Sequence, residues 1–377
     1  MDFSDSAHQP LAAQDSEDNA ELKLSNLFYI CIFVLFAIIC FLFYNTGSAW
    51  IGKIIKTVLK GKYEIGSTLV ARTTSALAIW FLVHAVLTLG NRNFEDSIQF
   101  LIHSKFKYIH FLICVALWIA FWFIPDGFFN FYMKFAMVIS LIYIIFQIYF
   151  LVIFFTDLNE KHASDDNLCC LFSITIVLCI VSIVGFALSY WMFKENKDQT
   201  IAFTTVNLII SIILFVMSIF IEHGSIFTSS LVTTYIAFLT WSALMCERSS
   251  TSSKGIEIVF TIIASIFTLV WCGYSAFASS SQLDDCQCSD SDSDCVCCDT
   301  THYPKFSLSF FHTLFALASV YVTMIVTHWG KTESEAPWTT SRGNIAKWVN
   351  IVSSWIVALL YFWILIAPLV CKNRDFS

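Results

Sequence analysis

The residues of this chain that could take part in chemistry are polar side chains placed inside long apolar stretches. Gln147 and Asn207 lie in two such stretches, and several hydroxyl residues follow one another in a third. Residues three and four positions apart share one face of a helix, so these hydroxyls form a stripe. A stripe of this kind favours either close helix packing, with hydroxyls bonded to backbone carbonyls, or a polar track for lipid head groups. The stripe comprises Ser230, Thr233, Thr234 and Thr240.

A second group of polar residues marks the ends of the longest apolar stretch. Asp126 precedes that stretch, and Asp157, Asn159 and Glu160 end it. Carboxylates near a membrane surface suit the ammonium groups of ethanolamine, choline or serine. The alternative is that they are solvated residues at helix ends, although an acid at the C-terminal end of a helix is mildly unfavourable. We therefore expect these four residues, together with the buried amides and hydroxyls, to line a lipid groove.

Histidines and cysteines give weaker signals. His84, His312 and His328 lie within or at the ends of apolar stretches, where a lone histidine is more often a packing residue than a proton relay, and no two have a spacing suited to a metal. Five cysteines at 286–298 stand among aspartates, but their C-x-C spacing is not the usual one for zinc. A reduced loop, disulfides and a soft-metal site stay open there. No phosphate-binding loop, HExxH motif or nucleophile elbow occurs, so we expect no cofactor, no metal and no enzyme activity.

The elements that position these residues follow from composition. Hydrophobic residues make up 57% of the 377 positions and charged residues only 13%, which one soluble core of this size cannot hide. The apolar residues form runs of about 20, the length that crosses the hydrocarbon core, without the alternation of barrel strands. The sequence therefore predicts an all-α polytopic membrane protein with about ten transmembrane helices. The stretches are roughly 26–50, 69–90, 108–125, 129–158, 168–193, 201–221, 226–246, 256–279, 306–328 and 346–371.

The fourth stretch and the N-terminal tail stand out. A helix over 128–161 would be about 45 Å long or more, so it must tilt strongly or extend beyond the membrane. Residues 1–25 are acidic and polar, which is typical of a disordered tail and unlike a cleavable signal peptide. With a cytosolic N-terminus, the outer loops would carry more Lys and Arg than the inner ones, an arrangement that the positive-inside rule disfavours.

Five stretches of sequence, in the same order along the chain, resemble the Serinc (serine incorporator) family. They include Phe-Ile-Pro-Asp-Gly at 123–127, a Gln-containing apolar run that ends in Asp157, and Leu-Thr-Trp-Ser-Ala at 239–243. The chain lacks the family's cysteine-rich N-terminus and its long insert after Glu247. The stretches are Phe123–Gly127, Gln147–Glu160, Thr228–Glu247, Ser309–Trp329 and Ser353–Phe376.

The resemblance implies two four-helix bundles joined by a long oblique fourth helix. It also implies cytosolic termini, which we adopt against the count of positive charges, in a plasma membrane or endomembrane protein. The chain then divides into an acidic tail (1–25), helices one to three (26–127), the oblique helix (128–161), helices five to eight (162–279), an acidic cysteine-rich loop (280–305), and helices nine and ten with the C-terminal tail (306–377).

The same resemblance implies lipid handling: aiding the entry of serine into phosphatidylserine and sphingolipids, scrambling phospholipids without an energy source, or both. The expected partners are membrane phospholipids, then serine, lipid-synthesis enzymes and a second copy of the chain, with no nucleic acid. One alternative is a secondary carrier for serine, which is disfavoured because Gly and Pro interrupt few of the stretches. Another is a non-transporting scaffold that recruits lipid-synthesis enzymes through the acidic tail and loop.

Overall fold

In the computed structural model, every regular element of the described residues is an α-helix. Eight of the described helices are long and apolar enough to cross a membrane, and a further apolar helix is shorter. The prediction of an all-α polytopic membrane protein is confirmed, whereas the predicted stretch 256–279 lies almost wholly outside the described residues. The described residues are 11–50, 65–89, 98–164, 168–192, 197–221, 224–245, 262, 308–327, 329 and 339–370.

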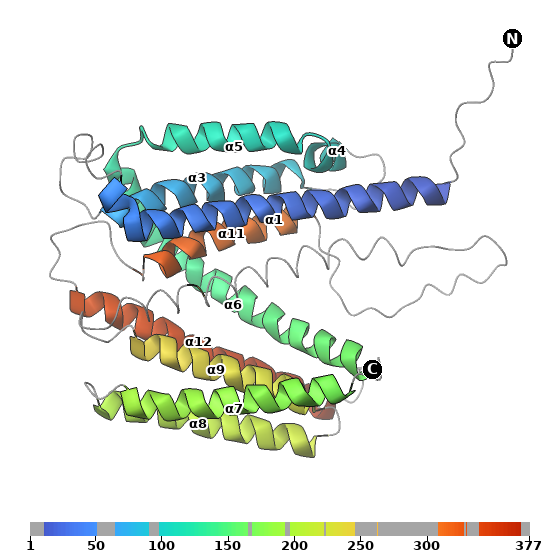
Figure 1. The fold of residues 1–377 in the computed structure, drawn as a ribbon, viewed down its shortest axis with the longest axis vertical. Helices are drawn as coiled ribbons and strands as arrows, with labels where there is room; N and C mark the ends of the chain where they lie inside the picture. Colours follow the sequence, from blue (N-terminus) through green and yellow to red (C-terminus); the bar gives the residue numbers. More distant parts are fainter. Residues whose placement is uncertain are drawn as a thin grey trace, which may run out of the picture. The chain divides into compact units, whose positions relative to one another are not determined.

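The chain forms two compact units, each built from two separate segments (Figure 1). Unit 1 consists of residues 1–136 and 267–326, and unit 2 of residues 137–266 and 327–377. Each unit therefore contains helices that are distant from one another in the sequence.

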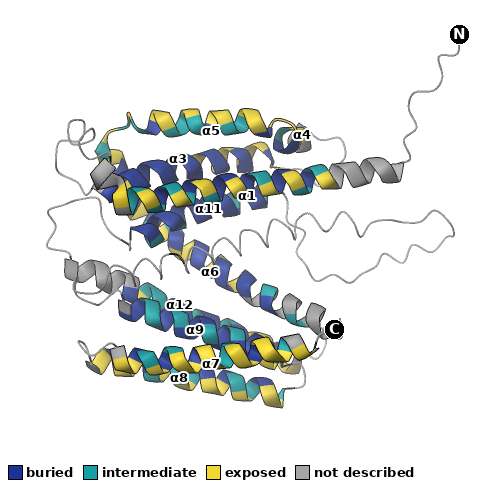
Figure 2. Ribbon diagram, viewed as in Figure 1, coloured by how far each residue is buried: buried dark blue, intermediate teal, exposed yellow. Residues whose placement is uncertain are grey.

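In unit 1, helix α3 is the central element. It packs against α11, α1 and α5, and Figure 2 shows that most of α3 and α11 is buried. Two hydroxyls of α11 join it to α3: the Ser309 Oγ donates to the carbonyl of Ala85 over 2.8 Å, and the Thr323 Oγ1 donates to the Thr74 Oγ1 over 2.7 Å. The helices of unit 1 are α1 (Leu11–Trp50), α3 (Ile65–Leu87), α4 (Ile98–Ser104), α5 (Lys107–Phe121), the first part of α6 (Asp126–Ser164) and α11 (Leu308–Val326).

Helix α1 corrects one prediction. It begins at Leu11, so the prediction of disorder over residues 1–25 is wrong for residues 11–25. That segment contains no Gly or Pro after Pro10, and it is rich in Ala, Glu and Leu, which are strong helix formers. The helix of the apolar run that follows therefore extends toward the N-terminus into the acidic segment.

Helix α6 is a single helix of 39 residues, close to the predicted range 128–161. Pro125 stands immediately before it, and a proline disfavours the helical conformation of Ile124, which separates α6 from α5. At 1.5 Å per residue α6 is about 60 Å long, twice the thickness of the hydrocarbon core. Its tilt in the membrane stays a prediction.

In unit 2, helix α9 has the central position. It packs against α7, α12 and α8. Its N-terminus is capped by Ser225, whose Oγ accepts a hydrogen bond from the backbone N–H of Thr228 over 3.3 Å. The helices of unit 2 are the rest of α6, α7 (Leu168–Met192), α8 (Lys197–Phe220), α9 (Ile226–Met245) and α12 (Thr339–Val370).

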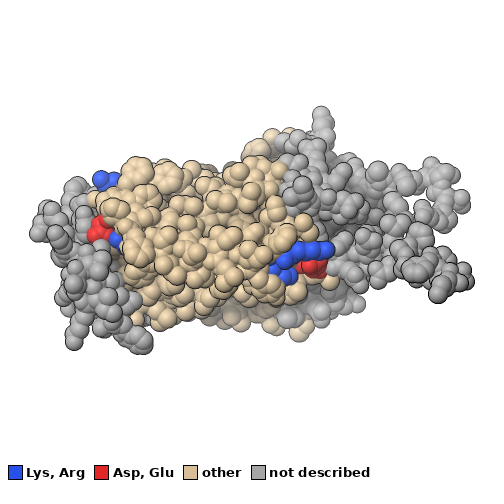
Figure 3. Space-filling view, turned by 90° about the horizontal axis from the view of Figure 1, so that it is seen from above, with Lys and Arg blue, Asp and Glu red and all other residues tan. Residues whose placement is uncertain are grey.

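The outer faces of the peripheral helices are apolar. Leu112 of α5 is 66% exposed and Ile183 of α7 is 65% exposed, and both helices show many such side chains. On the face drawn in Figure 3, the charged side chains of the described residues gather at two ends and leave an uncharged band between them. An apolar surface of this extent is stable in lipid and not in water. The protein is an integral membrane protein.

Candidate functional site

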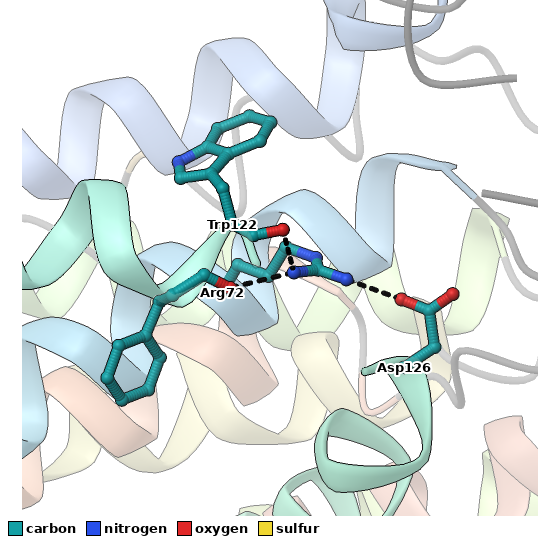
Figure 4. A network of polar contacts seen from close by, with 4 residues as sticks. Arg72, Trp122 and Asp126 are labelled. Atoms are coloured by element: carbon teal, nitrogen blue, oxygen red, sulfur yellow. Dashed lines mark hydrogen bonds and ion pairs between the residues drawn. The ribbon is translucent and has the colours of Figure 1, made fainter. Parts of the chain in front are cut away.

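The predicted groove residue Asp126 lies in unit 1, where it is bound by an arginine (Figure 4). The Arg72 Nη2 of α3 lies 2.6 Å from the Asp126 Oδ1. The Arg72 Nη1 donates to the carbonyl oxygens of Phe121 over 2.7 Å and Trp122 over 3.0 Å. The guanidinium also lies 4.4 Å from the ring centroid of Phe129.

This arrangement joins the end of α5 to the start of α6. Carbonyls at the C-terminal end of a helix are not used by the helix itself, and Arg72 supplies donors for two of them. Its side chain is 4% exposed and that of Asp126 is 19% exposed, so the ion pair is largely shielded from water. Sequence reasoning missed Arg72, although it is the only Lys or Arg in the stretch 69–90.

Asn207 and Thr240, both predicted groove residues, lie together in unit 2. The Asn207 Nδ2 donates to the Thr240 Oγ1 over 2.7 Å and to the Ser354 Oγ over 3.0 Å. The Asn207 Oδ1 accepts from the Trp355 Nε1 over 3.0 Å. The amide of α8 is thus hydrogen-bonded to α9 and α12, and its polar atoms are used within the protein. Sequence reasoning missed both α12 partners, which follow one another in the chain.

The rest of the α9 stripe divides into bonded and unbonded hydroxyls. The Ser230 Oγ donates to the carbonyl of Phe227 over 2.7 Å, one turn earlier in α9. The Thr234 Oγ1 donates to the carbonyl of Ser230 over 2.8 Å and to that of Leu178 on α7 over 3.1 Å. These contacts support the packing interpretation for both residues. The Thr233 Oγ1, by contrast, is buried without a hydrogen-bond partner.

The candidates on α6 also differ among themselves. Gln147 is 2% exposed, and its Oε1 is buried without a partner. The Asn159 Oδ1 accepts from the Ser225 Oγ over 2.8 Å, and the carbonyl of Ser225 accepts from the Tyr361 hydroxyl over 3.3 Å. Asp157 and Glu160 lie on the same helix, but their side chains are outside the described part of the chain.

The predicted groove residues therefore do not form one cluster. Asp126 belongs to unit 1, and the other nine belong to unit 2. Within unit 2 the structure brings Asn207 and Thr240 together, and it places Asn159 beside the start of α9. Among the described residues, no group of three or more His, Cys, Asp or Glu is arranged to hold a metal, and the cysteines at 286–298 lie outside those residues.

Comparison with known proteins gives a consistent match along the chain. The family model described as serine incorporator (Serinc) matches residues 17–294 and 284–374. That family name refers to a serine incorporator and names no enzyme activity.

Individual relatives match over most of their length. Serine incorporator 3 of Bos taurus is 28% identical over 82% of this chain and 80% of its own length. Serine incorporator 2 of Homo sapiens is 27% identical over 86% of this chain and 83% of its own length. A probable serine incorporator of Dictyostelium discoideum is 26% identical over 93% of this chain and 94% of its own length. The family match covers the helices of both units, and the chain therefore belongs to the Serinc family of multi-pass membrane proteins.

Proposed function

We propose that this protein handles lipids within the membrane and so aids the incorporation of serine into phosphatidylserine and sphingolipids. The observation that carries the proposal is the match to the serine incorporator family along nearly the whole chain. The membrane phospholipids are its first partners, and free serine and the lipid-synthesis enzymes are the others. The process that we propose at the molecular level is movement of phospholipids between leaflets without an energy source.

Two unsatisfied polar atoms support this proposal. The Gln147 Oε1 and the Thr233 Oγ1 are buried in membrane-length helices of unit 2 and have no hydrogen-bond partner. An unsatisfied polar atom in such surroundings is costly, so proteins seldom keep one without a use. A lipid head group that reaches these atoms would supply the missing partners. The carboxylates of Asp157 and Glu160, farther along α6, would contact its ammonium group.

The liposome experiment tests lipid movement directly. The purified full chain is reconstituted into vesicles that contain a fluorescently labelled phospholipid, and a membrane-impermeant quencher reports how much label becomes accessible. We expect the protein to expose the label of the inner leaflet, whereas empty vesicles keep it protected. Protein-containing vesicles that keep the label protected would contradict the proposed movement between leaflets.

A matched pair of variants tests the role of the free hydroxyl. Thr233 and Thr175 are both 9% exposed, but the Thr175 Oγ1 donates to the carbonyl of Leu171 over 2.7 Å. Thr233→Val removes a hydroxyl that has no partner, so we expect slower lipid movement without loss of stability. Thr175→Val should leave lipid movement unchanged. Equal rates in both variants would show that Thr233 only packs.

Labelled serine distinguishes the other function classes. A carrier would take up serine into sealed vesicles with saturable kinetics, whereas a lipid-moving protein would not. A scaffold would lose its effect on serine incorporation in cells when residues 1–25 and 280–305 are deleted. We expect that the sealed vesicles take up no serine. We also expect that cells carrying the deletions still incorporate labelled serine into lipid.

A further inference from the structure

Four histidines of unit 1 lie together, an arrangement that the sequence did not reveal. His84 comes from α3, His103 from α4, His110 from α5 and His312 from α11. The ring centroid of His84 lies 4.5 Å from that of His110 and 5.2 Å from that of His312. The ring centroids of His103 and His312 are 5.1 Å apart. We call these four residues the histidine cluster. His103 and His312 are fully buried, His84 is 3% exposed and His110 is half-buried.

The hydrogen bonds of the cluster fix the positions of its protons. The His103 Nε2 lies 3.0 Å from the Asn26 Oδ1, which accepts, so this nitrogen carries a hydrogen. In a neutral ring the His103 Nδ1 then accepts from the His312 Nε2, 3.0 Å away. The His84 Nδ1 donates to the carbonyl of Trp80 over 2.9 Å. Neutral rings thus connect α1, α4 and α11, while His84 bonds within α3.

This assignment leaves two nitrogens bare. The His312 Nδ1 and the His84 Nε2 carry lone pairs, and both are buried without a hydrogen-bond partner. Each belongs to a ring whose other nitrogen already donates a hydrogen bond. Among the rings of His84, His103 and His312, these two nitrogens are the places where a proton can be accepted.

Apart from the Asn26 amide, the groups around the rings are aromatic or basic. From α1, Tyr29 stacks on His103 at a centroid distance of 4.8 Å, and its hydroxyl lies 3.3 Å from the His103 carbonyl and 3.5 Å from the His110 Nδ1. From α3, the Trp80 ring contacts His84 at 4.6 Å. From α5, the buried Lys107 Nζ lies 3.4 Å from the Ser25 Oγ. The described contacts of the rings include no carboxylate.

A proton would therefore weaken the packing of this region. An imidazolium donates from both nitrogens, and a new N–H on His84 or His312 would have no acceptor in its present place. The charge would lie among three other imidazoles, and the described contacts of the rings include no carboxylate to balance it. Exposure of the ring to water removes both penalties, so protonation favours separation of the helices.

We propose that the histidine cluster is an acid-sensitive lock on unit 1. At neutral pH the uncharged rings hold α1, α3, α4 and α11 together. Uptake of a proton at the His84 Nε2 or the His312 Nδ1 opens the contacts between these helices. The lock concerns the packing of unit 1 and does not depend on the lipid-handling function.

Two substitutions remove the bare nitrogens and keep the existing bonds. His84→Asn retains an N–H donor at the position of Nδ1, facing the Trp80 carbonyl, and His312→Gln retains a donor at the position of Nε2, facing His103. Neither amide titrates near neutral pH. Asn26→Ala is the matched control, because it removes the acceptor of His103 but leaves both bare nitrogens in place.

Hydrogen–deuterium exchange measures the opening of α3 and α11. The full chain is studied in lipid nanodiscs at pH 7.5 and 5.5, and the rates are corrected for the intrinsic dependence of exchange on pH. An exposed histidine is about nine-tenths protonated at pH 5.5, so each histidine that titrates only when exposed raises the opening equilibrium about 10-fold. With both His84 and His312 exposed on opening, we expect a rise of at least about 100-fold in the parent protein. The rise should be about 10-fold smaller in each single variant and about 100-fold smaller in the double variant, where only His103 and His110 can still respond. Asn26→Ala should raise opening equally at both pH values.

Two outcomes would overturn the proposal. One is a parent protein whose opening equilibrium is the same at pH 5.5 and 7.5. The other is a double variant that keeps the full rise of the parent protein, since acid would then act elsewhere. A double variant that is looser at both pH values, but whose difference between them is about 100-fold smaller than that of the parent, would still support the lock.

Discussion

Arg72 illustrates how much of unit 1 depends on a single side chain. Its guanidinium binds the Asp126 carboxylate and two carbonyls at the end of α5, and it is itself almost fully buried. Removal of one partner of a buried ion pair leaves the other partner poorly solvated, which costs more than the pair gains by forming. The position of the first turn of α6 therefore depends on this residue.

We expect Arg72→Met to lower the free energy of unfolding by about 2–4 kcal/mol, because Asp126 and two carbonyls lose their donors. Denaturant titration of the protein in detergent, followed by tryptophan fluorescence, measures the loss. Lys134→Met is the control, since Lys134 is an exposed residue of α6. The double variant Arg72→Met with Asp126→Asn should recover part of the loss; a fully additive loss would show that the ion pair contributes nothing.

His103 makes the stability of unit 1 depend on pH. It lies in α4, which is not one of the membrane-length helices, and burial, followed by the charge of His84, lowers the pKa of His103 from 6.5 to about 3. The unfolded chain therefore takes up a proton below pH 6.5 that the folded chain does not. Stability is complete above pH 6.5 and is lost as the pH falls toward 3.

At pH 5 this loss amounts to about 2 kcal/mol from His103 alone. His103→Gln keeps a donor for Asn26 and removes the titration, so we expect a smaller difference between unfolding curves at pH 7.5 and pH 5. The measurement is the same denaturant titration at the two pH values. A variant with the full pH dependence of the parent would contradict the assignment to His103.

The polar residues themselves could be predicted from sequence more easily than their partners. Gln147, Asn207 and the α9 hydroxyls stand out because polar side chains are rare in uncharged apolar runs. The partners are distant in the chain: Asn207 and Ser354 are 147 positions apart, and Arg72 and Asp126 are 54 apart. No helical periodicity connects such positions, so the sequence could not pair them.

At the scale of the element, the two central helices have similar composition. Both α3 and α9 are rich in Ser, Thr and Ala, and their hydroxyls donate to carbonyls one turn earlier, as the Thr73 Oγ1 does to Leu69 over 2.9 Å and the Thr240 Oγ1 does to Ile236 over 2.8 Å. Small and hydroxyl side chains let helices approach closely in lipid. Helix composition thus indicates which helix of each unit has the most neighbours.

The contact between α7 and α9 gives a sharp test of this closeness. A Cβ added at Gly185 would lie 3.6 Å from the Ala237 Cβ, whereas a Cβ at Gly127 would meet nothing within 4 Å. We expect Gly185→Leu to destabilise the protein by about 1–3 kcal/mol through overpacking, and Gly127→Leu to leave stability nearly unchanged. Thermal unfolding in detergent compares the two. Equal midpoints would show that α7 and α9 have room to separate.

The existence of the helices was predictable because lipid leaves the backbone few alternatives. Uncharged runs of about 20 residues sufficed for most of them, and the long fourth stretch corresponds to α6. The start of α1 was not predictable in this way, since residues 11–25 are polar and only their helix propensity favours the observed helix. Hydropathy therefore fails where a membrane helix extends into water.

At the scale of the whole molecule, the orientation in the membrane stays a prediction. Resemblance to Serincs places both termini in the cytosol, whereas the count of basic residues favours the opposite. Epitope tags at residues 1 and 377 test this by antibody staining before and after selective permeabilisation of the plasma membrane. We expect staining of both tags only after permeabilisation. Staining of intact cells that carry the protein at their surface would reverse the orientation.

The interleaved order of the two units constrains biogenesis. Unit 1 needs α11, which the ribosome delivers only after α7, α8 and α9 of unit 2 have been made, and unit 2 in turn awaits α12. The hydroxyl-rich face of α3 that α11 later covers therefore stays uncovered after insertion, while more than a hundred further residues are synthesised. Ribosome-bound intermediates that end before residue 308 should consequently be the form of this chain most in need of a membrane chaperone.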